Sequence, residues 1–206
     1  MSQTHALAKP ACAALLALAL CSAASPLPAE PVPESERIPV DVRRTTLIVR
    51  DIDRSLPLYR DALGLKVVYD ERLGAGKDEQ GNPTPPTTRL VLLRANDSFI
   101  GALGLMQRLN DPNPPPAENK RPMAGDSIVV INAKDLDTRF ATIKAVPGVT
   151  VHTEPTRIEY PGPGGVGVIP VMFSAVFDPD GFFIEINQIL GTPAGSEKPA
   201  DDSKQE

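Results

Sequence analysis

The stretch FDPDGFFIEINQ, residues 177–188, decides how the rest of the chain is interpreted. An Asp-Pro-Asp-Gly turn leads into a strand-like run whose only charged residue is Glu185, between Ile184 and Ile186. Successive side chains of a strand point to opposite faces, so the Glu185 carboxylate points away from the face that its apolar neighbours share. The stretch therefore predicts a sheet with one apolar face and one face that carries a carboxylate.

An internal repeat links this stretch to the first half of the chain. LIVRDIDRSL (47–56) aligns with INAKDLDTRF (131–140) at a shift of 84 residues. The same shift places Phe99-Ile100-Gly101 on Phe183-Ile184-Glu185. Self-similarity at a fixed shift indicates a structural unit that occurs twice.

Each repeat has the same predicted order of elements. The Asp-apolar-Asp motif follows a β-rich run and precedes a helical pattern, which predicts helices at about 53–63 and 136–145. Three strand-like runs follow each helix. One such module leaves a sheet face uncovered, so the sequence predicts an α+β fold in which two paired βαβββ modules form a curved mixed sheet around a cavity. The modules could pair within one chain or between two, which leaves a homodimer open.

The N-terminus is typical of a cleaved targeting segment. The apolar run 11–25 is too short to span a bilayer, and Ser22-Ala23-Ala24 predicts cleavage before Ser25, so we expect a periplasmic or secreted protein. Lipoprotein anchoring at Cys21 is the second alternative, because Leu20 stands where such a site needs a small residue. The predicted segments are a signal peptide (1–24), a Pro-rich spacer (25–39), the first βαβββ module (40–109), a linker (110–122), the second module (123–190) and a disordered tail (191–206).

The composition of the chain indicates which kinds of binding partner to expect. The 206 residues carry a net charge of -5, which disfavours nucleic acid and anionic membrane surfaces and leaves a small molecule as the expected partner. Both cysteines lie within residues 1–24, so the mature chain would have no cysteine chemistry.

Two motifs together resemble a known family. DIDRSLPLYRDALGLKVVYD (51–70) and FDPDGFFIEINQ are similar to the vicinal oxygen chelate superfamily, which includes glyoxalase I, bleomycin-resistance proteins, fosfomycin-modifying enzymes and extradiol dioxygenases. The resemblance covers about residues 40–190. It implies the paired-module fold and, in the family's enzymes, a divalent metal held by the first and last strand of each module.

The metal positions that the resemblance implies are mostly occupied by residues that cannot bind a metal. They fall on Arg44, on Ile128 or Ser127, on Gly101 or Gly104, and on Glu185. Only Glu185 matches, and one carboxylate is too few for a transition-metal site, so we predict no metal and no cofactor. His152 lies in a strand outside the motif positions, where a single histidine is more often a surface residue than a ligand.

Face parity predicts the residues around the cavity. The candidate ligand-binding residues are Arg44, Thr46, Asn132, Tyr160, Glu185 and Asn187. Tyr160, the adjacent glycine loop and residues 74–87 are candidate lids. Glu185 is the best catalytic candidate, and we expect it to face Arg44, whose positive charge would replace that of the metal; in the alternative register Asn187 or water satisfies Glu185.

Two classes of function follow. The sequence favours an exported, metal-independent binder of a small, partly apolar molecule, as bleomycin-resistance proteins are. The alternative is an enzyme: a glyoxalase-like lyase or isomerase, or a dioxygenase-like enzyme, with a divergent metal site, or a metal-free catalyst with Glu185 as general base.

Overall fold

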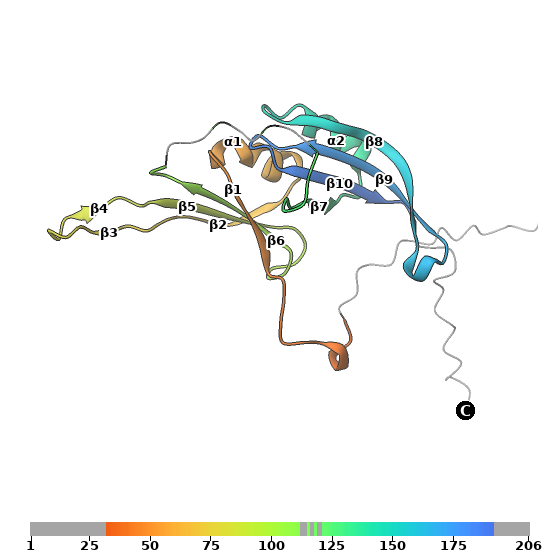
Figure 1. The fold of residues 1–206 in the computed structure, drawn as a ribbon, viewed down its shortest axis with the longest axis horizontal. Coiled ribbons are helices and arrows are strands. Elements are labelled where there is room, and N and C mark those ends of the chain that lie inside the picture. The colour runs from red at the N-terminus through yellow and green to blue at the C-terminus, as the bar shows by residue number, and fades with distance from the viewer. Residues whose placement is uncertain (1–31, 112–114, 116–117, 119–120, 192–206) are drawn as a thin grey trace, which may run out of the picture.

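The computed structural model describes residues 32–111, 115, 118 and 121–191. The predicted signal peptide, its cleavage site and the tail from Thr192 onwards lie outside these ranges. Within them, no helix has both the length and the apolar character needed to cross a membrane. The elements, labelled in Figure 1, are the short helix η1 (Glu34–Glu36), β1 (Arg44–Ile48), α1 (Ile52–Leu56), η2 (Pro57–Ala62), β2 (Lys66–Leu73), β3 (Gly76–Lys77), β4 (Pro83–Thr84), β5 (Thr88–Arg94), β6 (Ala102–Arg108), β7 (Val129–Asn132), α2 (Leu136–Lys144), β8 (Thr150–Pro161), η3 (Pro163–Gly165), β9 (Val168–Phe177) and β10 (Phe183–Ile189).

The strands form two four-stranded sheets of the same design. Strand order is β1-β6-β5-β2 in the first sheet and β7-β10-β9-β8 in the second. In both, the first strand of the module pairs in parallel with its last strand, and the remaining pairs are antiparallel. This repeated arrangement confirms the predicted α+β fold of two paired βαβββ modules.

Helix α1 begins after a side-chain cap at Asp51 and changes geometry at a proline. The Asp51 side chain accepts a hydrogen bond of 2.9 Å from the Asp53 amide, which satisfies a free donor of the first turn. Pro57 has no amide hydrogen to continue the α-helical pattern, and the chain proceeds as the π-helical segment η2, with Leu63 N donating to Leu58 O.

One glutamine in each module ties its last strand to its helix. Gln107 Oε1 accepts from the Ile52 amide at 3.2 Å, and Gln188 Oε1 accepts from the Leu136 amide at 3.0 Å. The helix residues differ by 84 positions (136 − 52), but the glutamines differ by 81 (188 − 107). The repeat therefore has a shift of 84 up to the helices and of 81 in the last strands.

The predicted alignment of the last strands is accordingly wrong by three residues. Thr46 pairs with Gly104 in the first sheet, and Val130 pairs with Glu185 in the second, so Gly104 and not Gly101 is the counterpart of Glu185. Phe99-Ile100-Gly101 lies before β6 instead. An odd shift matters because it exchanges the two faces of a strand.

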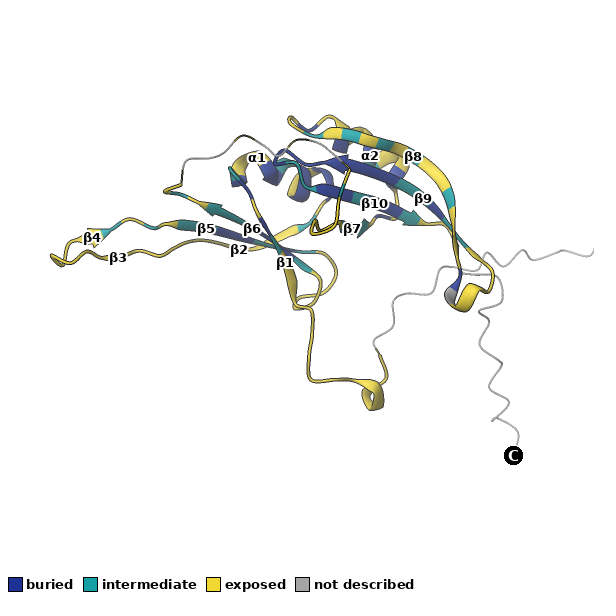
Figure 2. Cartoon of the chain, viewed as in Figure 1, coloured by how far each residue is buried: buried dark blue, intermediate teal, exposed yellow. Residues whose placement is uncertain are grey.

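Both helices and both sheets contribute to one hydrophobic core. The modules therefore pair within the chain, and Figure 2 shows the buried residues concentrated around the helices and the inner strands. The β3–β4 hairpin, formed by the segment predicted as a lid, projects away from this core and is exposed. Representative core residues are Leu56, Tyr59, Val91, Leu105, Phe140, Ile143, Ile184 and Ile186.

The Asp178–Gly181 turn of the second module is bound to helix α1 of the first. Tyr59 Oη donates to Asp178 Oδ2 at 2.7 Å, and Ser55 Oγ donates to Asp180 Oδ2 at 2.9 Å. All four side chains are at least nine-tenths buried. These contacts fix the position of the second module's turn relative to strand β1, where a cavity opens.

Candidate binding cavity between the modules

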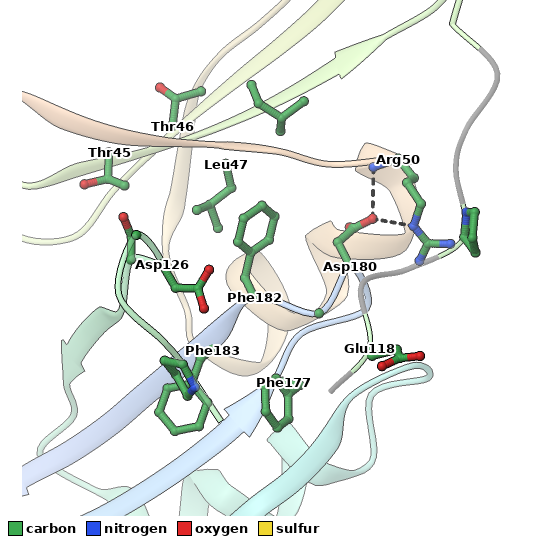
Figure 3. Close-up of a pocket in the computed structure, with 16 residues that line it drawn as sticks. Thr45, Thr46, Leu47, Arg50, Glu118, Asp126, Phe177, Asp180, Phe182 and Phe183 are labelled. Atoms are coloured by element: carbon green, nitrogen blue, oxygen red, sulfur yellow. Dashed lines mark hydrogen bonds and ion pairs between the residues drawn. The ribbon is translucent and has the colours of Figure 1, made fainter. Parts of the chain in front are cut away.

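A cavity of about 600 Å³ lies between β1, the segment before β7 and the Asp178–Gly181 turn. Figure 3 shows it with the ring of Phe182 at its centre in this view, between Leu47 and Phe183. Phe177 and Phe183 are paired across β9 and β10, and their ring centroids are 5.3 Å apart in an edge-to-face arrangement. Together these residues give the cavity an apolar wall.

Seven of the residues that line the cavity have polar or charged side chains, namely Thr45, Thr46, Arg50, Glu118, Asp126, Ser127 and Asp180. Asp180 Oδ1 accepts from the Arg50 amide at 2.9 Å and from Arg50 Nε at 2.8 Å, the two dashed lines of Figure 3. This ion pair is largely buried, with 19% and 5% of the two side chains exposed. Asp126 and Glu118 also line the cavity, and Asp126 Oδ2 accepts from the Met123 amide at 2.8 Å.

The buried carboxylate behind this wall has an altered acidity. Burial raises the pKa of Asp178, although hydrogen bonds from Tyr59 and from the amides of Phe182 and Asp180 oppose that rise. Burial also raises the pKa of Tyr59 well above 10.0, and the nearby Asp178 carboxylate adds to the effect. Tyr59 therefore stays protonated and continues to donate its hydrogen bond.

A second cavity, of about 450 Å³, lies between the start of β1 and strand β7. Its polar lining residues are Arg44, Thr45, Asn96 and Asn132. Thr45 lines both cavities, so the two are neighbours along the seam between the edge strands β1 and β7.

The sequence comparison decides the family. The model of the Glyoxalase/Bleomycin resistance protein/Dioxygenase superfamily matches residues 42–186, well over half of the chain. The chain belongs to this superfamily. No curated protein sequence matches it significantly.

A solved structure of a glyoxalase family protein supports the fold, and two further solved structures have lower similarity. A glyoxalase family protein from Bacillus cereus is 11% identical, with a TM-score of 0.54 over 76% of this chain and 99% of that one. The trypanothione-dependent glyoxalase I of Leishmania major is 21% identical, with a TM-score of 0.45 over 71% and 85% of the two chains. The antibiotic-binding protein TnmS3 from Streptomyces is 17% identical, with a TM-score of 0.44 over 74% and 99%. At these identities the likeness concerns the fold and not the ligand.

The metal that superfamily enzymes hold does not fit the residues of this chain. Across the parallel strand pairs, Thr46 stands opposite Gly104, and Val130 stands opposite Glu185. A Cβ atom at Gly104 would lie 2.7 Å from Thr46 Oγ1, so the packing itself excludes a carboxylate there. Among the described residues, no three His, Cys, Asp or Glu side chains are grouped as metal ligands. Glu185 is the only carboxylate at these positions.

The candidate residues from the sequence divide between two places. Arg44 and Asn132 line the second cavity, and Thr46 lines the first. Glu185 and Asn187 line neither, and Tyr160 lies in β8, paired with Ile169, rather than in a lid. The role of Glu185 in catalysis stays a prediction.

The expected contact between Arg44 and Glu185 does not form. Within the described residues neither side chain has an ion-pair partner within 4.0 Å. Glu185 Oε2 instead accepts from Asn187 Nδ2 at 3.4 Å, which is the alternative register considered above. Asn187 is 9% exposed, and its Oδ1 has no donor in the described part of the chain.

Sequence reasoning missed most of the first cavity. Arg50, Asp126 and Phe182 line it, yet none occupies a motif position of the superfamily's metal site. The run Phe182-Phe183 was a usable signal, because two aromatic residues directly after a tight turn bring large apolar rings to that end of the sheet. Asp126 comes from the linker side of β7 and gave no signal.

Proposed function

We propose that the protein is exported and binds a small, partly apolar molecule in the first cavity, without a complete metal site. The observation that carries this proposal is the cavity itself: about 600 Å³ between the modules, with an aromatic wall beside polar and charged side chains. Ligand sites in proteins are typically concave, largely apolar and several hundred Å³ in volume, with a small number of polar groups that fix orientation.

The lining indicates which part of such a ligand would bind where. Phe177, Phe182 and Phe183 offer faces and edges to a planar or aliphatic body. Thr45 offers a hydroxyl group from strand β1, on the same side of the strand as Leu47, whereas Thr46 points to the other side. A neutral molecule with one flat apolar part and one hydroxyl group therefore suits both sides of the cavity.

The absence of a fitting metal-ligand set supports binding that does not depend on a metal. Of the four superfamily positions, only the one at Glu185 has a carboxylate, and Glu185 does not line the cavity. Residues 11–25 support export, and N-terminal sequencing of the mature protein should find Ser25 first. Retention of Met1 would remove export from the proposal.

A titration with 2-naphthylmethanol tests the binding proposal. We expect this neutral, flat alcohol to shift the ¹H–¹⁵N NMR signals of Ser127, Gly181 and Phe183, which line the cavity. Phe182→Ala should weaken its binding about tenfold, because the ring at the centre of the wall is lost. Phe99→Ala is the matched control, since Phe99 is 50% exposed and lines neither cavity. The absence of shifts at these three amides up to the solubility limit of the probe would reject the proposal.

A further inference from the structure

The two cavities occupy equivalent places in the two modules. Thr45–Ile48 of β1 line the first and Val129–Asn132 of β7 line the second, at the shift of 84. Phe182-Phe183 and Gly101-Ala102 line the first and second cavity in turn, at the shift of 81. The internal repeat has therefore produced two equivalent cavities, which are neighbours along the seam between β1 and β7.

The described lining of the second cavity lacks the aromatic side chains and the carboxylates of the first cavity. Phe177, Phe182 and Phe183 of the first cavity correspond to Asn96, Gly101 and Ala102 of the second, so the aromatic wall is absent there. Asp126 corresponds to Val42. The described residues that line the second cavity include one arginine, Arg44, and no Asp or Glu.

The side chains of Arg44 and Asn132 in the second cavity form few hydrogen bonds with other described residues. Arg44 is exposed and forms no hydrogen bond or ion pair with another described residue through its guanidinium. Asn132 Oδ1 accepts from the Ile189 amide at 3.4 Å, which turns the amide nitrogen away from that contact and makes it available as a donor. A guanidinium and an amide that both line an open cavity favour an acceptor group, and above all an anion.

Charges around the cavity agree with an anion. Arg43 lies with its guanidinium carbon 4.8 Å from the Phe99 ring centroid, and Arg94 donates to the carbonyl of the lining residue Ala95. Acidic neighbours include Asp97, whose Oδ1 already accepts from the amides of Phe99 and Ile100 at 2.7 and 2.8 Å, and Glu185, which stands opposite the lining residue Val130 and accepts from Asn187. The remaining surface of the cavity is aliphatic, including Leu65, Leu103 and Ile131.

We propose that the second cavity is a separate site for a small monocarboxylate with a short aliphatic body. The Arg44 guanidinium binds the carboxylate through two parallel N–H groups, a geometry that the planar guanidinium fork offers and a lysine does not. Asn132 adds an amide donor, and the aliphatic chain lies against Leu65 and Leu103. The site is independent of the ligand proposed for the first cavity.

Three probes of equal length and different charge test this site. Hexanoate, hexan-1-ol and hexylammonium are titrated into the protein while ¹H–¹⁵N NMR follows Asn96, Gly101 and Asn132, which line the second cavity. Hexanoate is expected to bind about tenfold more tightly than the alcohol, because its bonds to the guanidinium are charge-assisted. Arg44→Gln should lower hexanoate binding to that of the alcohol.

Arg43→Gln is the matched control, because Arg43 is the adjacent arginine and does not line the cavity. It should retain hexanoate binding, and both variants should keep the dispersed spectrum of the folded protein. Equal binding of all three probes, hexanoate shifts unaffected by Arg44→Gln, or shifts at Ser127 and Gly181 instead would overturn the proposal. Phe182→Ala should leave hexanoate binding unchanged, so failure at the first cavity is distinguishable from failure here.

Discussion

The contact between Tyr59 and Asp178 is expected to stabilise the pairing of the two modules. Tyr59 lies in the π-helical segment after α1 and Asp178 begins the turn before β10, 119 residues away. Their hydrogen bond of 2.7 Å lies in the buried contact between the modules. Tyr59→Phe removes the hydroxyl and keeps the ring that packs in the core.

The surroundings of Asp178 indicate how much stability Tyr59→Phe should remove. Asp178 Oδ1 keeps its hydrogen bonds from the amides of Asp180 and Phe182, but Oδ2 loses the donor that Tyr59 provides. Asp178 is 2% exposed, so water does not readily replace that donor. Removing one partner of a buried hydrogen bond to a carboxyl group costs about 1.5–3 kcal/mol, and we expect about 2 kcal/mol here.

Urea denaturation at pH 7, followed by circular dichroism, measures this loss directly. Tyr160→Phe is the matched control, because Tyr160 is 41% exposed and its hydroxyl forms no hydrogen bond with a described residue; it should change the free energy of unfolding by less than about 0.5 kcal/mol. A Tyr59→Phe variant as stable as the Tyr160→Phe variant would refute the stabilising role of the hydrogen bond.

Three further predictions concern the pH dependence of stability, the packing at Gly104 and the role of Glu185 in β10. Above pH 10 an unfolded chain loses the Tyr59 proton, while the folded chain, whose Tyr59 pKa is raised, retains it. The free energy of unfolding should therefore fall as pH rises, by up to about 1.4 kcal/mol per pH unit. Tyr59→Phe should remove that part of the pH dependence in denaturation curves. Gly104→Ala should destabilise by about 1–3 kcal/mol because its Cβ would lie 2.7 Å from Thr46 Oγ1, and adding Thr46→Ala should recover part of the loss in thermal unfolding. Glu185→Gln should leave 2-naphthylmethanol and hexanoate binding within twofold of the original in NMR titrations, since Glu185 lines neither cavity.

The backbone architecture could be predicted because its signals are local. The helical spacing after Asp51 and the Asp-Pro-Asp-Gly turn each depend on neighbouring residues, and each has the predicted structure. The last-strand register could not be obtained in the same way. Matching Phe99-Ile100 to Phe183-Ile184 used only two side chains. The register itself is set by the long-range pairing of β6 with β1 and by the hydrogen bond from the Ile52 amide to Gln107.

The cavities could be predicted only in part because they form at the seam and not on one sheet face. Face parity placed Arg44 and Asn132 together, and they do line one cavity. Parity carries no information on how two edge strands approach, so the predicted contact of Arg44 with Glu185 failed. Asp126 reaches the first cavity from the linker side of β7, through a tertiary arrangement without a sequence motif.

Intermolecular nuclear Overhauser effects between bound 2-naphthylmethanol and the protein test the central claim most directly. Binding in the first cavity predicts cross-peaks from the naphthyl protons to the ring protons of Phe177, Phe182 and Phe183, and from the protons next to the hydroxyl group to the methyl group of Thr45. Cross-peaks confined to side chains outside the cavity, such as Tyr69 of β2 or Ile189 of β10, at saturating probe would contradict it.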